Sequence, residues 1–344
     1  MQVTDARAAL ADLWTGRGKR ARVSRAILSP LTRVYGAVVR GRGLLYDRGL
    51  LKAHDVSVPV VSVGNLTVGG TGKTPVAAWL ARQLVERGAN PAVVLRGYGG
   101  DETLVHRRLN ESISVIACPD RVRGMRDAIA EAADIIVLDD AFQHRRAARD
   151  ADIVLIDADT WTEGRRLLPA GPWREPLTAA RRASLIIVTR KAASHDAVDA
   201  VKRALSAAAP RVVVTTVSLA PGELRSTATG QTMPLHALEG ADVTAIAAIA
   251  NPVAFFRQLT QLGAVVRPHA FPDHYAFTLR DARRLAASAL ASDFAVCTLK
   301  DAVKLESFWP PEAGSLWYVS QRLKVEDGKQ HIDRLLNDLL ALRQ

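Results

Sequence analysis

The stretch that decides the fold is VPVVSVGNLTVGGTGKTPVAAWLARQL, which runs from Val58 to Leu84. An apolar, β-branched run leads into a glycine-rich turn, and a helical pattern opens at Gly72-Lys73-Thr74. Glycines let backbone amides close round phosphate oxygens, Lys73 can reach the β- and γ-phosphates, and the Thr74 hydroxyl can bind Mg²⁺. The predicted nucleotide-binding residues are Asn65, Thr67, Gly69, Gly70, Thr71, Gly72, Lys73 and Thr74.

The loop departs at one position from the general phosphate-loop pattern G-x-x-x-x-G-K-[ST]. The first glycine of that pattern is replaced by Thr67, and Gly69 and Gly70 lie inside the loop instead. A glycine-rich turn without a ligand is therefore the alternative interpretation. Because an apolar strand, Gly-Lys-Thr and a helical pattern coincide, we favour the nucleotide site.

Two adjacent carboxylates follow another apolar run. This run ends at Leu138, and Asp139 and Asp140 come directly after it. A divalent cation would relieve the repulsion between the two carboxylates. Many ordinary strands also end in an acidic residue, so the interpretation depends on the nearby phosphate loop. We predict that Thr74, Asp139 and Asp140 hold Mg²⁺.

Short β-branched runs alternate with helical patterns along most of the chain. This alternation predicts an α/β fold, a mostly parallel sheet covered by helices, which binds ligands beyond the carboxyl ends of its strands. Past residue 220, a turn at Pro221-Gly222 and a polar run predict a ribbon, after which a second βα pattern begins. The predicted parts are a basic helical segment at 1–55, a phosphate-loop domain at 56–220, a β-ribbon hinge at 221–239, a smaller α/β domain at 240–325 and an amphipathic helix at 326–344.

The composition is that of a folded chain. It has 344 residues, of which 48% are hydrophobic and 24% charged, and its two cysteines are too few for a disulfide framework. The first residues contain no apolar signal-peptide core, and no run reaches eighteen apolar residues. We therefore expect a protein that is soluble or bound to a membrane surface.

Positive charge gathers near the N-terminus. Residues 1–58 contain eleven Lys and Arg against four Asp, which is +7 of the total of +11, and such a segment attracts polyanions. Ser29-Pro30 is typical of a helix start, and the apolar positions that then recur at helical spacing before Gly41 are Leu31, Val34, Tyr35 and Val38. This helix either packs on the protein with solvated arginines or lies on an anionic membrane surface. Composition alone does not choose between them.

Seven motifs, in this order, resemble those of the tetraacyldisaccharide 4′-kinases, which phosphorylate the lipid A precursor of Gram-negative bacteria. They are VGNLTVGGTGKTP (63–75), RGYGGDE (96–102), DDAFQHR (139–145), GRRLLPAGPWREP (164–176), IANP (249–252), FPDHYAF (271–277) and TLKDAVK (298–304). The resemblance implies a RecA-like P-loop NTPase domain joined by a β-ribbon hinge to a smaller α/β domain. It also implies transfer of phosphate from ATP, with Mg²⁺, to the 4′-hydroxyl of an acylated glucosamine disaccharide 1-phosphate, forming lipid IVA.

The same resemblance points to the reacting groups and to the location. It marks Asp101 and His274 as catalytic, in a cleft that closes by hinge motion. Residues near the substrate would be Gln143, His144, Arg174 and Glu175. The family usually has an insertion where this chain fuses its R-G-Y-G and G-D-E motifs, so Asp101 lies close to the glycine turn that follows the apolar run 92–95. The implied location is peripheral, at the cytoplasmic face of the inner membrane, where the basic helix meets anionic lipid.

Two other classes of protein share some of these features. A membrane-recruited P-loop ATPase that drives partner binding would explain the basic helix, the phosphate loop and the acidic pair, but it would not require FPDHY in a second domain. A nucleic-acid-stimulated ATPase would explain the charge. With only 5% aromatic residues the chain offers no stacking platform for bases, so we expect no nucleic-acid partner.

Overall fold

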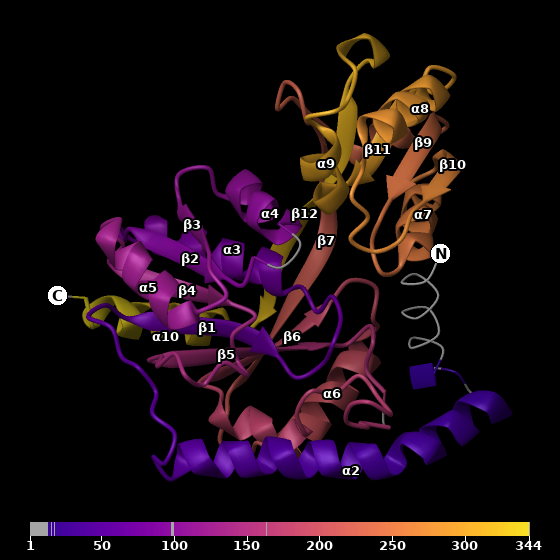
Figure 1. Ribbon diagram of the computed structural model, residues 1–344. Coiled ribbons are helices and arrows are strands. Elements are labelled where there is room, and N and C mark those ends of the chain that lie inside the picture. The colour runs from indigo at the N-terminus through magenta and orange to yellow at the C-terminus, as the bar shows by residue number, and fades with distance from the viewer. Residues whose placement is uncertain (1–12, 15, 17, 98–99, 163, 344) are drawn as a thin grey trace. The chain divides into compact units, whose positions relative to one another are not determined.

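The computed structural model describes residues 13–14, 16, 18–97, 100–162 and 164–343, and these form two compact units. Unit 1 combines Met1–Arg96, Asn110–Leu219 and Leu323–Gln344, and unit 2 combines Gly97–Leu109 and Ala220–Arg322. Figure 1 labels most helices and strands of both units. The fold is α/β with a mostly parallel sheet, as predicted.

Unit 1 is built on a parallel sheet with the strand order β3-β2-β4-β1-β5-β6-β7. The strands are β1 (Val60–Asn65), β2 (Pro91–Leu95), β3 (Ser114–Ala117), β4 (Ile135–Asp139), β5 (Ala151–Asp157), β6 (Leu185–Arg190) and β7 (Val214–Ser226). Val63 on β1 is in register with Asp139 on β4. The acidic end of β4 therefore lies beside the end of β1, from which the phosphate loop starts.

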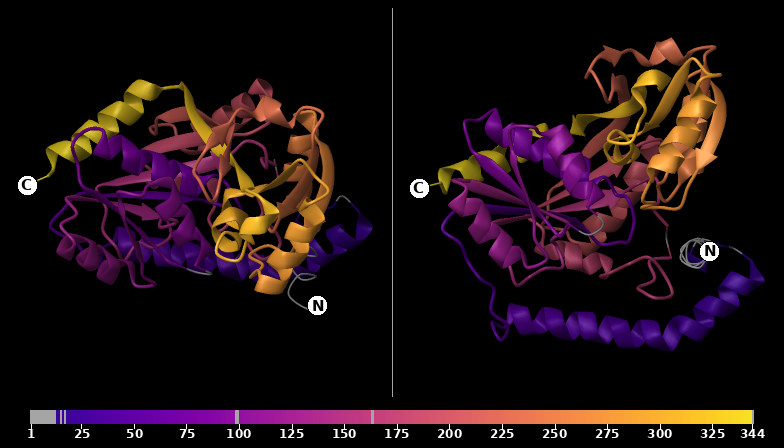
Figure 2. Two further views of the ribbon diagram at one scale, coloured as in Figure 1. Left: turned by 90° about the horizontal axis from the view of Figure 1, so that it is seen from above. Right: turned by 45° about the horizontal axis from the view of Figure 1, so that its top comes forward.

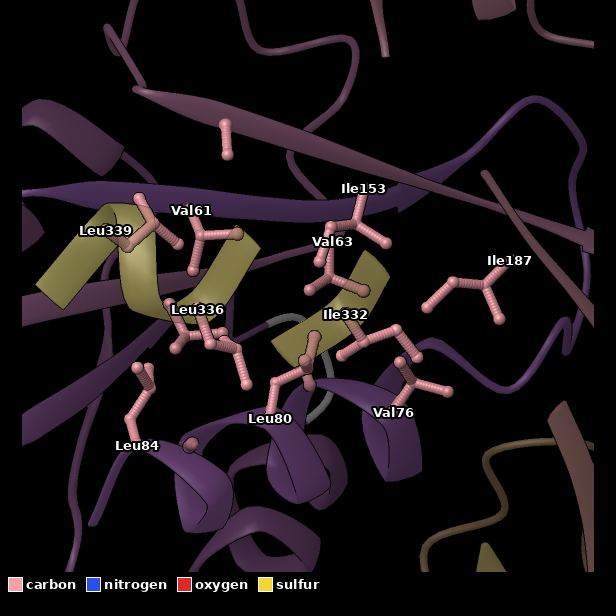
Figure 3. Close-up of a cluster of buried hydrophobic side chains, with 14 of the residues drawn as sticks. Val61, Val63, Val76, Leu80, Leu84, Ile153, Ile187, Ile332, Leu336 and Leu339 are labelled. Carbon is pink, nitrogen blue, oxygen red and sulfur yellow. The ribbon is translucent and has the colours of Figure 1, made fainter. Parts of the chain in front are cut away.

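Helices cover both faces of this sheet. They are α3 (Lys73–Val85), α5 (Arg121–Ala130), α6 (His195–Ala208), α10 (Lys329–Ala341) and the short η1 (Leu177–Arg182). On one face, α3 and α10 pack on alternate residues of β1, β4 and β5. Figure 3 shows Ile332, Leu336 and Leu339 of α10 close to Leu80 of α3 and Val61 of β1. The opposite face packs against α5, α6 and η1.

The described part of the basic N-terminal segment contains a long helix, α2 (Lys19–Asp47), which Figure 2 shows in its right-hand view. The predicted start at Ser29-Pro30 and stop before Gly41 are wrong, because Pro30 lies inside the helix. The C-terminal part stays helical past its glycines because Arg145 binds it, donating to the Gly43 carbonyl at 3.0 Å and to the Asp47 carboxylate at 2.7 Å.

Unit 2 contains a smaller parallel sheet with the strand order β10-β9-β11-β12. Its strands are β9 (Asp242–Ala247), β10 (Val265–Ala270), β11 (Phe294–Thr298) and β12 (Leu316–Asp327), and β8 (Thr232–Met233) pairs antiparallel with the end of β7. Its helices are α4 (Asp101–Leu109), α7 (Pro252–Gln261), α8 (Leu279–Ala289), α9 (Leu299–Leu305), η2 (Leu235–Leu238) and η3 (Pro311–Ala313).

The chain passes between the units in more places than the sequence indicates. Gly97–Leu109, placed above in the phosphate-loop domain, belongs to unit 2, and β12 runs from unit 2 back into unit 1. The predicted turn at Pro221-Gly222 is wrong, because β7 continues through both residues. Gly222 serves a close approach there: a Cβ at this position would lie 2.6 Å from Ser320 Oγ of β12. That these connections act as a hinge stays a prediction.

Candidate active site

The phosphate loop joins β1 to α3 in a conformation that only glycine adopts readily. Gly69 and Gly72 have φ of +126° and +84°. A Cβ at Gly72 would also lie 2.4 Å from Leu219 Cδ1, so the loop has no room for a larger residue there. Two hydrogen bonds from the ends of β1 and β6 fix the loop at Thr71. The Asn65 amide donates to Thr71 Oγ1 at 3.0 Å, and Thr189 Oγ1 donates to the Thr71 carbonyl at 3.0 Å.

Lys73 and Thr74 connect this loop to the acidic end of β4. The Lys73 ammonium lies 3.4 Å from the Gly69 carbonyl oxygen and 3.7 Å from Asp140 Oδ1. The Thr74 hydroxyl donates to Asp139 Oδ2 at 3.1 Å. The predicted loop residues and the predicted acidic pair are therefore in contact, although 65 positions separate Thr74 from Asp139.

The two carboxylates have different surroundings. Asp139 is buried, with 2% of its surface exposed. Asp140 has a left-handed backbone, with φ +50°, and its carboxylate accepts two hydrogen bonds from Arg174, at 3.0 and 3.2 Å. The Asp140 charge is thus balanced by Arg174 and Lys73. Asp139, beside the Thr74 hydroxyl, is the better placed of the two to face a metal ion.

These residues fit Mg²⁺. Thr74, Asp139 and Asp140 supply only oxygen ligands, which this ion prefers. No group of three or more His, Cys, Asp or Glu side chains suited to a metal occurs in the described part of the chain. A magnesium ion that accompanies a nucleotide needs no such group, because phosphate and water oxygens complete its shell.

Gln143 and Arg174 extend the polar network around the loop. The Gln143 amide donates to the Asn65 carbonyl at 2.9 Å, and Arg174 approaches Gln143 Oε1 at 3.4 Å. Phe142 is fully buried against β1, where a Cβ at Gly64 would lie 2.5 Å from its own Cβ. Gln143, the next residue, thus lies beside the phosphate loop.

His144 and Glu175 take part in the structure around the site. Burial, and then the charges of Arg121 and Arg149, lower the pKa of His144 from 6.5 to about 4, so its ring is neutral at pH 7. Glu175 is 7% exposed and accepts hydrogen bonds from Arg182 at 2.8 and 3.2 Å. Glu175 is thus paired with Arg182, whereas its neighbour Arg174 binds Asp140.

The two predicted catalytic residues meet within unit 2. His274 Nδ1 lies 2.9 Å from Asp101 Oδ2, without the alignment of a hydrogen bond. Asp101 opens α4 and is 3% exposed, and His274 has a left-handed backbone with φ +59°. Lys300 of α9 also reaches this pair, 3.0 Å from His274 Nε2 and 3.3 Å from Asp101 Oδ2. The shortened RGYGGDE segment therefore still delivers its carboxylate to the imidazole.

Three residues of the loop that carries His274 pack against one another. The ring centres of Phe271 and Tyr275 are 5.0 Å apart, and those of Phe271 and Phe277 are also 5.0 Å apart. Lys304 donates to the Tyr275 carbonyl at 3.2 Å. These contacts fix the loop on both sides of the strained His274 backbone.

The long helix α2 presents two different faces. One face binds unit 1: the Tyr35 hydroxyl donates to the Arg174 carbonyl at 3.0 Å, and Thr32 Oγ1 accepts from the Ala170 amide at 3.2 Å. At 3.6 residues per turn, six of the seven large apolar residues of α2 that are at least 42% exposed fall within an arc of about 80° on the opposite side. The six are Val23, Ile27, Leu31, Val34, Val38 and Leu45, and the seventh, Leu44, lies about 60° beyond the arc.

Sequence reasoning missed several polar residues at these sites. Thr189 and Lys191, at the end of β6, bond to the Thr71 and Gly70 carbonyls of the phosphate loop at 3.0 and 3.3 Å. Arg121 is 4% exposed, and burial lowers its pKa. Lys300 lies in the TLKDAVK motif, but no local pattern there predicts its contact with His274. Position at the carboxyl end of an apolar strand is the signal that could have identified Thr189 and Lys191.

Comparison with known proteins gives a consistent result. The sequence model of the family described as tetraacyldisaccharide-1-P 4′-kinase matches residues 24–104 and 99–341. The chain is similar to the tetraacyldisaccharide 4′-kinase of Anaeromyxobacter sp. (strain K), with 40% identity over 77% of each chain. It is 37% identical to that of Anaeromyxobacter sp. (strain Fw109-5), over 94% of this chain and 95% of the other. Among solved structures, LpxK from Aquifex aeolicus in complex with ATP aligns with a TM-score of 0.72 and 26% identity, covering 93% of this chain and 99% of that one.

Proposed function

The chain belongs to the tetraacyldisaccharide-1-phosphate 4′-kinase family, and from this premise we propose how its residues carry out the reaction. The substrates are ATP and an acylated glucosamine disaccharide 1-phosphate, and the product of transfer to the 4′-hydroxyl is lipid IVA. The observation that carries the proposal is the contact between Asp101 and His274, which are 173 positions apart in sequence. A P-loop ATPase that only drives partner binding would not need this pair, and membership of the kinase family disfavours that alternative.

Unit 1 holds the nucleotide. The phosphate loop surrounds the β- and γ-phosphates, and the Lys73 ammonium neutralises the charge that develops on them. Thr74, Asp139 and Asp140 would hold Mg²⁺, which would neutralise negative charge on the phosphates of ATP. Arg174 keeps Asp140 in place through its two hydrogen bonds.

Unit 2 acts on the acceptor. The Asp101 carboxylate takes the proton of the 4′-hydroxyl as the new O–P bond forms and the bond between the γ-phosphorus and the bridging oxygen breaks, releasing ADP. His274 orients and stabilises this carboxylate from 2.9 Å. Transfer requires the γ-phosphate held by unit 1 to meet the hydroxyl at Asp101.

We also propose that the protein works on the cytoplasmic face of the inner membrane as a peripheral protein. The described residues include no helix long and apolar enough to cross a membrane. Support for surface binding comes from α2, whose apolar stripe faces away from unit 1 and is flanked by the exposed Arg33 and Arg40. This arrangement suits an anionic interface, with apolar side chains among acyl chains and arginines among head groups.

The test is phosphate transfer from labelled ATP to the disaccharide acceptor, measured beside ATP loss without acceptor. Asp101→Ala and His274→Ala should each lower kcat about 10²- to 10⁴-fold with little change in the KM for ATP. The double variant should be little worse than the worse single one, because residues that act as a unit are non-additive.

His269→Ala is the matched control, since this histidine contacts Ser288 rather than the catalytic pair. It should keep near wild-type turnover. ATP loss that proceeds without any phosphorylated lipid would refute the kinase proposal, and losses that multiply in the double variant would refute joint action of Asp101 and His274.

A further inference from the structure

Lys300 has no part in the mechanism above, yet it makes the best-aligned contact with the catalytic imidazole. Its ammonium lies 3.0 Å from His274 Nε2 in hydrogen-bond geometry, whereas the contact between His274 Nδ1 and Asp101 lacks that alignment. Lys300 also lies 3.3 Å from Asp101 Oδ2 and 3.5 Å from Asp273 Oδ1. The Lys300 ammonium thus contacts His274, Asp101 and Asp273.

We propose that Lys300 is a positioning residue that sets the tautomer of His274. An ammonium has three donors and no acceptor, so a ring nitrogen that bonds to it must accept and cannot carry a proton. Nε2 is therefore the bare nitrogen, and the proton of the neutral ring is on Nδ1. Nδ1 is the ring nitrogen that lies 2.9 Å from the Asp101 carboxylate.

The opposite tautomer would be unfavourable in the same geometry. It would put the lone pair of Nδ1 against a carboxylate oxygen at 2.9 Å, and a ring proton on Nε2 against the Lys300 ammonium at 3.0 Å. Both contacts would be repulsive. By excluding this state, Lys300 keeps the ring proton on Nδ1, the nitrogen nearer to the Asp101 carboxylate.

The fold holds Lys300 rigidly enough for this task. It lies in the first turn of α9, where Thr298 caps the helix and Asp301 is fully buried. Asp301 accepts from Thr298 Oγ1 at 2.7 Å and from the Ala248 amide at 3.0 Å, which ties α9 to the end of β9. One turn later, Lys304 binds the carbonyl of Tyr275, next to His274. The helix and the histidine loop are therefore fixed to each other.

This inference rests on the proposed function for its kinetic consequence only. If Asp101 accepts the acceptor proton, a ring whose proton stays on Nδ1 stabilises the negative carboxylate 2.9 Å away. Loss of this tautomer should then lower kcat and leave the KM for ATP unchanged, because the nucleotide binds elsewhere.

The deciding experiment is a long-range ¹H–¹⁵N correlation spectrum of the full-length protein labelled at histidine, with His274→Gln used to assign the signal. In the wild type we expect His274 to show a protonated Nδ1 and an unprotonated Nε2. Lys300→Arg should keep this pattern, since a guanidinium also only donates. Lys300→Met should lose it, with proton appearing on Nε2, and should lower kcat about 10- to 100-fold.

Lys304→Met is the matched control. It removes a lysine from the same helix and frees the same loop, but Lys304 contacts Asp301 and Tyr275 rather than the imidazole. It should lower the melting temperature and leave the Nδ1–H tautomer in place. A wild-type spectrum with Nε2 protonated, or a Lys300→Met spectrum identical to the wild type, would overturn the proposal. Full activity of His274→Ala would instead defeat the proposed function while the spectrum still decided the tautomer.

Discussion

The apolar stripe of α2 gives the sharpest prediction about membrane binding. Ile27 and Val38 expose 70% and 63% of their surfaces. Full burial of such a side chain contributes about 1.5–3 kcal/mol, so inserting the exposed parts among acyl chains contributes about 1–2 kcal/mol each. Replacing both with serine should weaken vesicle binding by about 2 kcal/mol or more, which is about 30-fold.

The assay is sedimentation with vesicles of anionic phospholipid over a range of lipid concentrations. The free energy of unfolding of the double variant should differ from that of the wild type by at most about 0.5 kcal/mol. Both positions are on the surface, and serine has a helix propensity similar to those of isoleucine and valine. The matched control is Val253→Ser with Leu290→Ser, which removes side chains that are 59% and 73% exposed in unit 2. Unchanged binding of the α2 variant, or an equal loss in the control, would refute the reasoning.

Three further predictions concern the phosphate loop and its surroundings. Lys73→Ala should abolish transfer with the fold intact, since its ammonium lies at the loop surface, and near wild-type turnover would contradict the assignment. Asp139→Asn should raise the Mg²⁺ concentration needed for half-maximal rate more than Asp140→Asn does, because Asp139 contacts Thr74 and Asp140 is already paired with Arg174; titrations with equal midpoints would oppose this. The free energy of unfolding should decrease as the pH is lowered from 6.5 to about 4, because in this range the unfolded chain protonates His144 while the folded chain holds it neutral. His144→Gln should reduce that fall by at most about 3 kcal/mol in denaturant titrations at several pH values, and an equal slope in both proteins would remove the role of His144.

Features that depend on contiguous sequence could be predicted well. The phosphate loop follows from glycines, a lysine and a helix start within sixteen residues of Val58, and the family membership that the seven motifs indicated is confirmed. The acidic pair could be linked to the loop because parallel strands present their carboxyl ends at one edge. The α/β class followed from the alternation of β-branched runs and helical patterns.

Features that depend on contacts between distant segments could not be predicted. The length of α2 depends on Arg145, about a hundred residues away, which binds Gly43 and Asp47 beyond the glycines expected to end the helix. The place of Gly97–Leu109 in unit 2 depends on packing of α4 against α9, two helices that no local pattern connects. The role of Lys300 could be recognised only from the structure, because it depends on the contact between Lys300 and His274.

The position of α10 has a consequence for how the protein is made. This helix supplies Ile332, Leu336 and Leu339 to the core that also contains Val61 of β1 and Leu80 of α3. The ribosome adds these three residues about 270 positions after Val61. During most of its synthesis, the nascent chain therefore exposes to solvent the apolar side chains of the phosphate-loop sheet that α10 later covers. Unit 1 cannot close its core until translation is nearly finished, and a chain cut short before Lys329 would expose that face to chaperones and proteases.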